Sequence, residues 1–105
     1  MSSNKTIYLS PSSKKGKKWM VLVDGKTVHF GAEGYEDYTI HKDPERMERY
    51  VNRHKAKENW NKSGIATPGF WSRWLIWNKP SFNASLKDIE KRFKVKIIKS
   101  SKPFK

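Results

Sequence analysis

The chain contains no cysteine, which excludes disulfide bonds and thiolate metal sites and favours the interior of a cell or virus particle over a secreted setting. It also lacks a long hydrophobic run. No apolar stretch approaches the roughly 20 residues that span a membrane, and the first residues lack the apolar segment of a signal peptide. We therefore expect neither a membrane span nor a cleaved leader.

Acidic residues are scarce. The 105 residues include 10 Asp and Glu against 23 Lys and Arg, which gives a formal net charge of +13. Such a charge favours polyanionic partners, namely nucleic acid, an acidic protein surface or an anionic membrane face. Most of the few acids fall between Glu33 and Glu48, so an acidic segment interrupts an otherwise basic chain.

The pattern of a catalytic or metal site is also missing. The histidines His29, His41 and His54 match no metal-ligand spacing. The acidic segment lies in an expected loop, without the rigidly placed Lys or His that a Mg²⁺-dependent nuclease would need. No Gly-rich phosphate loop is visible. We expect a non-enzymatic protein with no catalytic residues, no metal, no cofactor and no small-molecule substrate.

A β-hairpin is the clearest local pattern. Two runs rich in β-formers, Lys18–Val23 and Lys26–Phe30, are joined by Asp24 and Gly25. A two-residue Asp-Gly link is typical of a type I′ turn, because both central positions need positive φ. The residues that follow, 31–38, contain two glycines and several acids, which predicts a loop.

The first predicted helix begins at Asp43, as N-cap, with Pro44 at its first position, where the missing N–H costs nothing. It should run to about Asn59. Its apolar stripe, at helical spacing, consists of Met47, Tyr50 and Val51.

Two shorter helices should follow. Thr67 and Pro68 repeat the pattern of a cap followed by proline and predict a helix through Trp77. Ser85, with Asp88 three residues later, resembles a capping box and predicts a third helix to Phe93. The apolar stripe of this third helix is predicted to consist of Leu86, Ile89 and Phe93.

These elements predict a small single domain of the α+β class, in which the N-terminal hairpin and a C-terminal strand over Lys94–Lys99 form one sheet packed against two or three short helices. Lys5–Leu9 is expected to be a short edge strand. We divide the chain into a flexible basic N-terminal segment (1–16), the domain (17–99) and a basic tail (100–105).

Three tryptophans fall close together in residues 69–78, and they form either a core or a face for a partner. Trp71 and Trp74 fit a core cluster, whereas Trp77 is the one expected to be partly exposed. An exposed Trp can stack on unpaired bases or anchor a protein interface.

The candidate binding residues are basic, with one aromatic. The loop lysines and the cationic face of the first helix suit phosphate contacts or an acidic partner surface, although either can equally be a solvated face. The full set of candidate residues is Lys14, Lys15, Lys17, Lys18, Arg46, Arg49, Arg53, Lys57, Arg73 and Trp77.

Three stretches carry a family resemblance: residues 23–32, residues 38–54 and residues 69–80. In these stretches, over roughly Trp19 to Phe93, the chain resembles an uncharacterised family of small basic proteins of large eukaryotic DNA viruses, of the phycodnavirus and mimivirus type. The resemblance supplies no catalytic or binding residues. It implies a viral setting, in the virion or in the cytoplasm or nucleus of an infected host cell.

In that setting two functions compete. The first is a viral structural protein, a minor capsid or capsid-associated component that docks on capsid proteins through basic and aromatic surfaces. The second is a nucleic-acid-binding protein that neutralises or condenses the genome without sequence preference. The acidic segment beside basic arms narrowly favours the first, because a DNA-condensing protein would rarely carry it.

Overall fold

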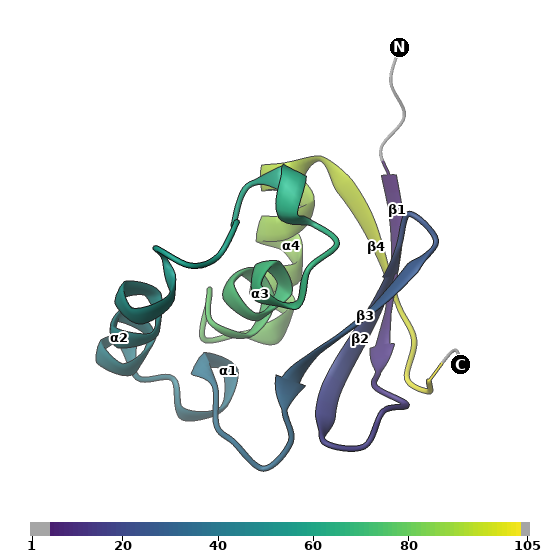
Figure 1. Cartoon of the computed structure of the whole chain (residues 1–105). Helices are drawn as coiled ribbons and strands as arrows, with labels where there is room; N and C mark the ends of the chain where they lie inside the picture. Colours follow the sequence, from purple (N-terminus) through teal and green to yellow (C-terminus); the bar gives the residue numbers. More distant parts are fainter. Residues whose placement is uncertain (1–4, 104–105) are drawn as a thin grey trace.

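The computed structural model, which describes residues 5–103, contains one four-stranded sheet with the strand order β3-β2-β1-β4. The helices gather on one face of this sheet (Figure 1). β1 pairs antiparallel with β2, β2 antiparallel with β3, and β4 parallel with β1. The predicted α+β class is confirmed. The strands are β1 (Lys5–Pro11), β2 (Lys17–Val23), β3 (Lys26–Ala32) and β4 (Val95–Lys99).

β1 is an inner strand, so its prediction as an edge strand was wrong. Residues 5–11 belong to the sheet rather than to a flexible segment, and residues 1–4 lie outside the described part of the chain. The side chains of Ile7 and Leu9 are fully buried under the helices. The alternating pattern of a short strand does not show which strands lie beside it. Here one of the two neighbours is β4, which comes from the other end of the sequence.

The hairpin of β2 and β3 is confirmed. Asp24 and Gly25 both have positive φ, 52° and 75°, as a type I′ turn requires. The register pairs Trp19 with Phe30 and Val21 with Val28, which places all four side chains toward the helices. β3 extends to Ala32, and its outer edge has no neighbouring strand among residues 5–103.

The expected loop after β3 contains a short helix at its end, α1 (Tyr38–His41). Asp37 begins this helix, because its carboxylate accepts a hydrogen bond from the N–H of Thr39 at 3.0 Å. The same carboxylate pairs with the ammonium of Lys18 at 2.6 Å and is buried. The loop therefore continues into a fixed turn.

The helix α2 (Pro44–His54) begins as predicted, since Asp43 accepts a hydrogen bond from the N–H of Glu45. It ends at His54 rather than near Asn59. None of its residues is buried, so the predicted buried stripe was wrong: Met47, Tyr50 and Val51 are only half-buried. α2 lies away from the sheet, at the far side of the helical layer (Figure 1).

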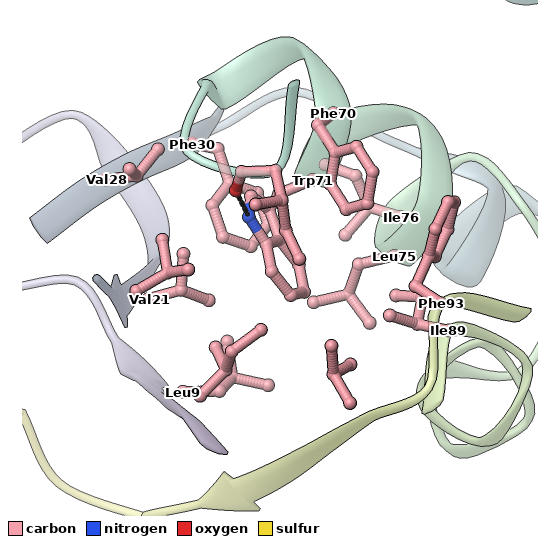
Figure 2. Packing of buried hydrophobic residues seen from close by; sticks show 14 residues of the cluster. Leu9, Val21, Val28, Phe30, Phe70, Trp71, Leu75, Ile76, Ile89 and Phe93 are labelled. Atoms are coloured by element: carbon pink, nitrogen blue, oxygen red, sulfur yellow. Dashed lines mark hydrogen bonds between the residues drawn. The ribbon is translucent and has the colours of Figure 1, made fainter. Parts of the chain in front are cut away.

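The aromatic block forms the centre of the core. After the 3₁₀ turn η1 (Lys62–Gly64), α3 (Pro68–Trp71) begins at Thr67 as predicted and continues as a π-helical turn, η2 (Ser72–Ile76). Trp71 is fully buried, and its indole N–H donates to the carbonyl of Ile65 at 2.7 Å (Figure 2). Its prediction as a core residue is confirmed, whereas Trp74 is half-buried against the cluster.

The last helix, α4 (Phe82–Phe93), begins earlier than predicted. Its N-cap is Ser81, which accepts from the N–H of Ala84, so the predicted capping box at Ser85 was wrong. Ser85 is fully buried, and its hydroxyl accepts from the N–H of Lys79 at 3.0 Å. Ile89 and Phe93 face the core, as predicted.

β4 leads into the basic tail. The N–H of Ser100 donates to the carbonyl of Leu9, and residues 100–103 are exposed, while 104 and 105 lie outside the described residues. Across residues 5–103, no helix has the length and apolar character that a bilayer crossing needs.

Candidate polyanion-binding surface

A basic groove runs along the open edge of β3. It has a volume of about 350 Å³, and its ionisable wall groups are Lys14, Lys17, Lys26 and His29, with no acid among the lining residues. Thr27, Val28, Ala66 and Pro68 complete the walls. Positive charge lining a concave surface concentrates anions beside it.

The loop between β1 and β2 holds two of these lysines in place. The hydroxyl of Ser12 accepts from the N–H of Lys14 at 3.0 Å, and the N–H of Lys17 donates to the carbonyl of Lys14 at 3.2 Å. A further hydrogen bond of 2.7 Å joins the Ser12 hydroxyl to Nδ1 of His29 on β3. These contacts tie the basic loop to the hairpin, so its lysines are held beside the β3 edge.

The groove lysines are available to a ligand. Within the described part of the chain, the ammonium groups of Lys14, Lys17 and Lys26 form no ion pair and no hydrogen bond. Lys14 and Lys26 are exposed, and Lys17 is half-buried. The neighbouring candidate Lys15 is exposed on the same loop. A phosphate approaching this edge would therefore displace no internal partner.

Lys18 differs from its neighbours in the loop. Its ammonium is bound to the buried carboxylate of Asp37, and its side chain is only 16% exposed. A buried ion pair of this kind is costly to break, because removing one partner leaves the other charge without compensation. The structure therefore places Lys18 in the framework that fixes α1, away from the free surface.

The cationic face of α2 is only partly free. Arg46 pairs with Glu36 at 3.1 Å, whereas Arg49, Arg53 and Lys57 are exposed and have no ion-pair partner among residues 5–103. These three side chains extend the positive surface beyond the groove. Arg49 and Arg53 lie on α2, which has no buried residue, and Lys57 lies in the turn that follows it.

Arg73 is engaged with aromatic rings. Its guanidinium lies 4.7 Å from the ring centre of Trp74 and 5.6 Å from that of Trp60, and it donates to the carbonyl of Trp77 at 2.6 Å. Burial, and then the nearby charge of Arg92, lower the pKa of Arg73. The faces of the two tryptophan rings offset part of the free-energy cost of burying this positive charge. Arg73 therefore acts inside the structure more than on its surface.

Trp77 is half-buried, between α2 and α1. Its ring is stacked on that of Tyr50, with centres 4.5 Å apart and planes 1° apart, and it also contacts His41 at 5.3 Å. Tyr50 in turn stacks on His54 at 4.4 Å. This column of rings is the main aromatic contact that holds α2 against the rest of the domain.

The acidic residues are largely engaged inside the molecule. Ion pairs join Asp24 to Lys5, Asp37 to Lys18, Glu36 to Arg46 and Asp88 to Arg92, and a carboxylate oxygen of Glu58 lies 3.7 Å from Nδ1 of His54. Asp43 caps α2, and Glu90 accepts from the N–H of Ile97. Of the predicted acidic segment, only Glu33, Glu45 and Glu48 are exposed without a partner in the described chain. Most of the unpaired charges on the surface are consequently positive.

The sequence did not identify Lys26, Thr27 or His29 as groove residues. The turn residues Asp24 and Gly25 fix the hairpin register, and that register is the signal that places Lys26 at the start of the edge strand. No sequence pattern showed that β3 would be an edge or that Ala66 and Pro68 would face it.

No group of three or more His, Cys, Asp or Glu side chains in the described residues is arranged to hold a metal ion. Burial opposes ionisation of Asp88, but hydrogen bonds from Asn78 and Arg92 and the nearby positive charges outweigh it, so the pKa of Asp88 is lowered. This carboxylate remains charged and serves the α4 ion pair.

Comparison with known proteins gives one partial match. Residues 7–54, just under half of the chain, are similar to a family described as "Family of unknown function (DUF5754)". No curated protein and no solved structure matches the chain. The matched segment contains most of β1, the hairpin, α1 and α2, but not α3, α4 or β4. It includes all three groove lysines and the arginines of α2.

Proposed function

We propose that this protein is a non-enzymatic, sequence-nonspecific nucleic-acid-binding protein that contacts phosphates through the basic groove. The observation that carries this proposal is the groove itself, which Lys14, Lys17 and Lys26 line without an acid and without an internal partner for their ammonium groups. Ammonium groups bind phosphates as point charges and release condensed counterions, which gives affinity without sequence reading. The exposed Arg49, Arg53 and Lys57 would add further phosphate contacts.

The charge distribution supports this proposal over a purely structural role. The sequence favoured a capsid component because an acidic segment seemed to lie beside basic arms. Glu36, Asp37 and Asp43 are engaged within the molecule, so only Glu33, Glu45 and Glu48 of that segment are exposed and without a partner in the described chain. The acidic surface that favoured the structural role is therefore smaller than the sequence suggests, which supports the nucleic-acid role.

The second candidate remains a minor capsid or capsid-associated protein of a virion. It is favoured by a different observation, the apolar outer face of the sheet. Tyr8 is 44% exposed and Ile98 is 40% exposed, and the two are paired across β1 and β4. Exposed apolar side chains grouped in this way are typical of a surface that meets another protein. In either role we place the protein in the virion or in the infected cell.

A salt series of binding to fluorescent duplex and single-stranded DNA tests the proposal. We expect tight binding whose logarithm falls steeply with the logarithm of salt concentration, with a slope of about −0.9 per phosphate contact on duplex DNA. Weak binding that disappears at physiological salt would contradict it. That result, together with recovery of the protein in purified capsid shells, would establish the structural role instead.

A pair of matched variants locates the binding site. Lys14→Gln, Lys17→Gln and Lys26→Gln together remove three groove charges. Lys87→Gln, Lys91→Gln and Lys96→Gln remove the same charge from α4 and β4, where all three lysines are exposed. We expect the salt dependence of the groove variant to correspond to about three fewer phosphate contacts, and that of the control variant to a smaller loss. Equal losses would mean that the net charge acts without a site.

A further inference from the structure

A second hollow adjoins the basic groove. It has a volume of about 460 Å³ and lies between β3, α2 and the α3–η2 segment. Lys17 and Pro68 line both hollows, so the two meet at these residues. The volume falls in the range of pockets that hold small organic groups, roughly 300–1,000 Å³.

Aromatic rings form much of its wall: Phe30, Tyr35, Tyr50 and Trp77. Three of them are fixed by packing. Phe30 is fully buried against Trp71, and Tyr50 and Trp77 are stacked on each other. Tyr35 is different, because its side chain is 73% exposed and it makes no ring contact within the described chain. A free ring at the edge of an aromatic hollow can cover a planar group that enters it.

The polar groups of the hollow are mostly held by contacts within the molecule. Beside the rings and Ser72, charged and titratable side chains line the hollow: Lys17, Lys18, Glu36, Asp37, His54 and Glu58. The three carboxylates each have a partner, since Asp37 pairs with Lys18, Glu36 with Arg46, and Glu58 lies 3.7 Å from His54. Burial, and then the charge of Glu58, raise the pKa of Tyr50 to about 12, so the Tyr50 hydroxyl stays protonated and can donate or accept a hydrogen bond. A Cβ at Gly69 would lie 2.0 Å from Oε1 of Glu58, so the glycine leaves the space that this carboxylate occupies. Aromatic rings beside polar groups that are already held in place suit a planar heterocycle, which has both flat faces and hydrogen-bonding edges.

We propose that the protein prefers single-stranded nucleic acid, whose phosphates lie in the basic groove while an unpaired base enters the adjoining hollow and stacks on Tyr35. This inference rests on the proposed nucleic-acid binding and names its substrate class. Bases in a duplex are stacked and paired, so none can enter the hollow without the cost of unstacking. Single-strand binders commonly combine a basic groove with aromatic stacking platforms, and Lys17 joins these two parts here.

The test compares three fluorescent oligonucleotides at the same ionic strength: a single strand, its duplex, and the same single strand with abasic sites. The abasic strand keeps the phosphates and lacks bases at those sites. It therefore tests the contribution of the bases with the unchanged protein. We expect the single strand to bind more tightly than both other ligands. Replacement Tyr35→Ala should weaken single-strand binding by about tenfold, as the loss of one stacked base does, and leave duplex binding unchanged.

Tyr8→Ala is the matched control, because it removes an exposed tyrosine from the outer face of the sheet. It should leave single-strand binding unchanged. If the abasic strand binds as well as the intact one and Tyr35→Ala has no effect, the inference fails, although groove-dependent binding to all three ligands would leave the proposed function intact. If the wild-type protein binds none of the three, both proposals fail.

Discussion

The helices α2 and α4 have similar local sequence patterns but different positions in the fold. Both begin at a side-chain cap and both have one apolar side. α4 buries Ser85, Ile89 and Phe93, whereas α2 buries no residue and is held by a column of stacked rings. Amphipathic patterning thus predicts that a helix forms, but the surface against which it packs decides how much of its apolar side is buried.

This difference has a functional meaning. α4 and the sheet enclose the core, which gives the domain its stability, while α2 forms one wall of the aromatic hollow and presents Arg49 and Arg53. A helix with few buried contacts opens at a lower free energy than the core. The proposed aromatic hollow therefore has one wall on the less stable side of the molecule.

The largest expected effect compares equivalent truncations on the two helices. Ile89→Ala removes a fully buried side chain from α4 and should lower the free energy of unfolding by about 2–5 kcal/mol. Met47→Ala removes a half-buried side chain from α2 and should cost less than about 1 kcal/mol, as changes away from the core usually do. Urea unfolding of both variants measures the difference. Equal losses would mean that α2 is as deeply packed as α4.

A second test removes one ring from the column. Trp77→Ala should speed amide hydrogen exchange in α2 by about tenfold or more, since a stacked aromatic pair contributes about 0.5–1.5 kcal/mol beyond its buried area. Exchange in β2 and α4 should change little. The matched control is Trp19→Ala, whose ring packs on Phe82 of α4 at 4.7 Å. That variant should instead speed exchange in the sheet and α4.

A third test concerns the start of α4. Ser81→Ala removes the cap and should cost about 1 kcal/mol. Ser85→Ala removes the buried acceptor of the Lys79 N–H, and an unsatisfied buried donor costs about 1–3 kcal/mol. Thermal melts of the two variants should therefore show both positions to matter. If Ser81→Ala had no effect on stability and Ser85→Ala unfolded the first turn of α4, Ser85 would be the N-cap, as the sequence predicted.

A further effect, confined to high pH, concerns the alkaline stability of the α2 side. Because the folded pKa of Tyr50 is raised from 10.0 to about 12, the unfolded chain loses this proton first as pH rises. The stabilising contribution is complete below pH 10 and is lost between pH 10 and 12. Tyr50→Phe should remove that component from the fall in stability with pH. An identical alkaline profile in both proteins would contradict the assigned environment of Tyr50.

Local signals in the sequence predicted much of the fold. The Asp24-Gly25 turn, the caps at Asp43 and Thr67, and the burial of Trp71 all depend on short-range rules or on one large side chain. The position of β1 in the sheet was not predictable in this way, because it depends on pairing with β4 from the other end of the chain.

The candidate site was predicted only in part. Lys14 and Lys17 were identified from charge alone, whereas Lys18 has the same local pattern and is held by Asp37. Lys26 and Tyr35 were missed, since only the folded register and the packing of α3 bring them to the two hollows. Charge counts in a sequence cannot separate paired side chains from free ones.

The most direct test of the central claim is the difference in salt dependence between the groove variant and its charge-matched control on α4 and β4. We predict that the Lys14, Lys17 and Lys26 replacements flatten the slope by about 2 to 3 on duplex DNA, as three lost phosphate contacts require, while the control changes it less. An unchanged slope in the groove variant would contradict the account, because phosphates would then be bound elsewhere.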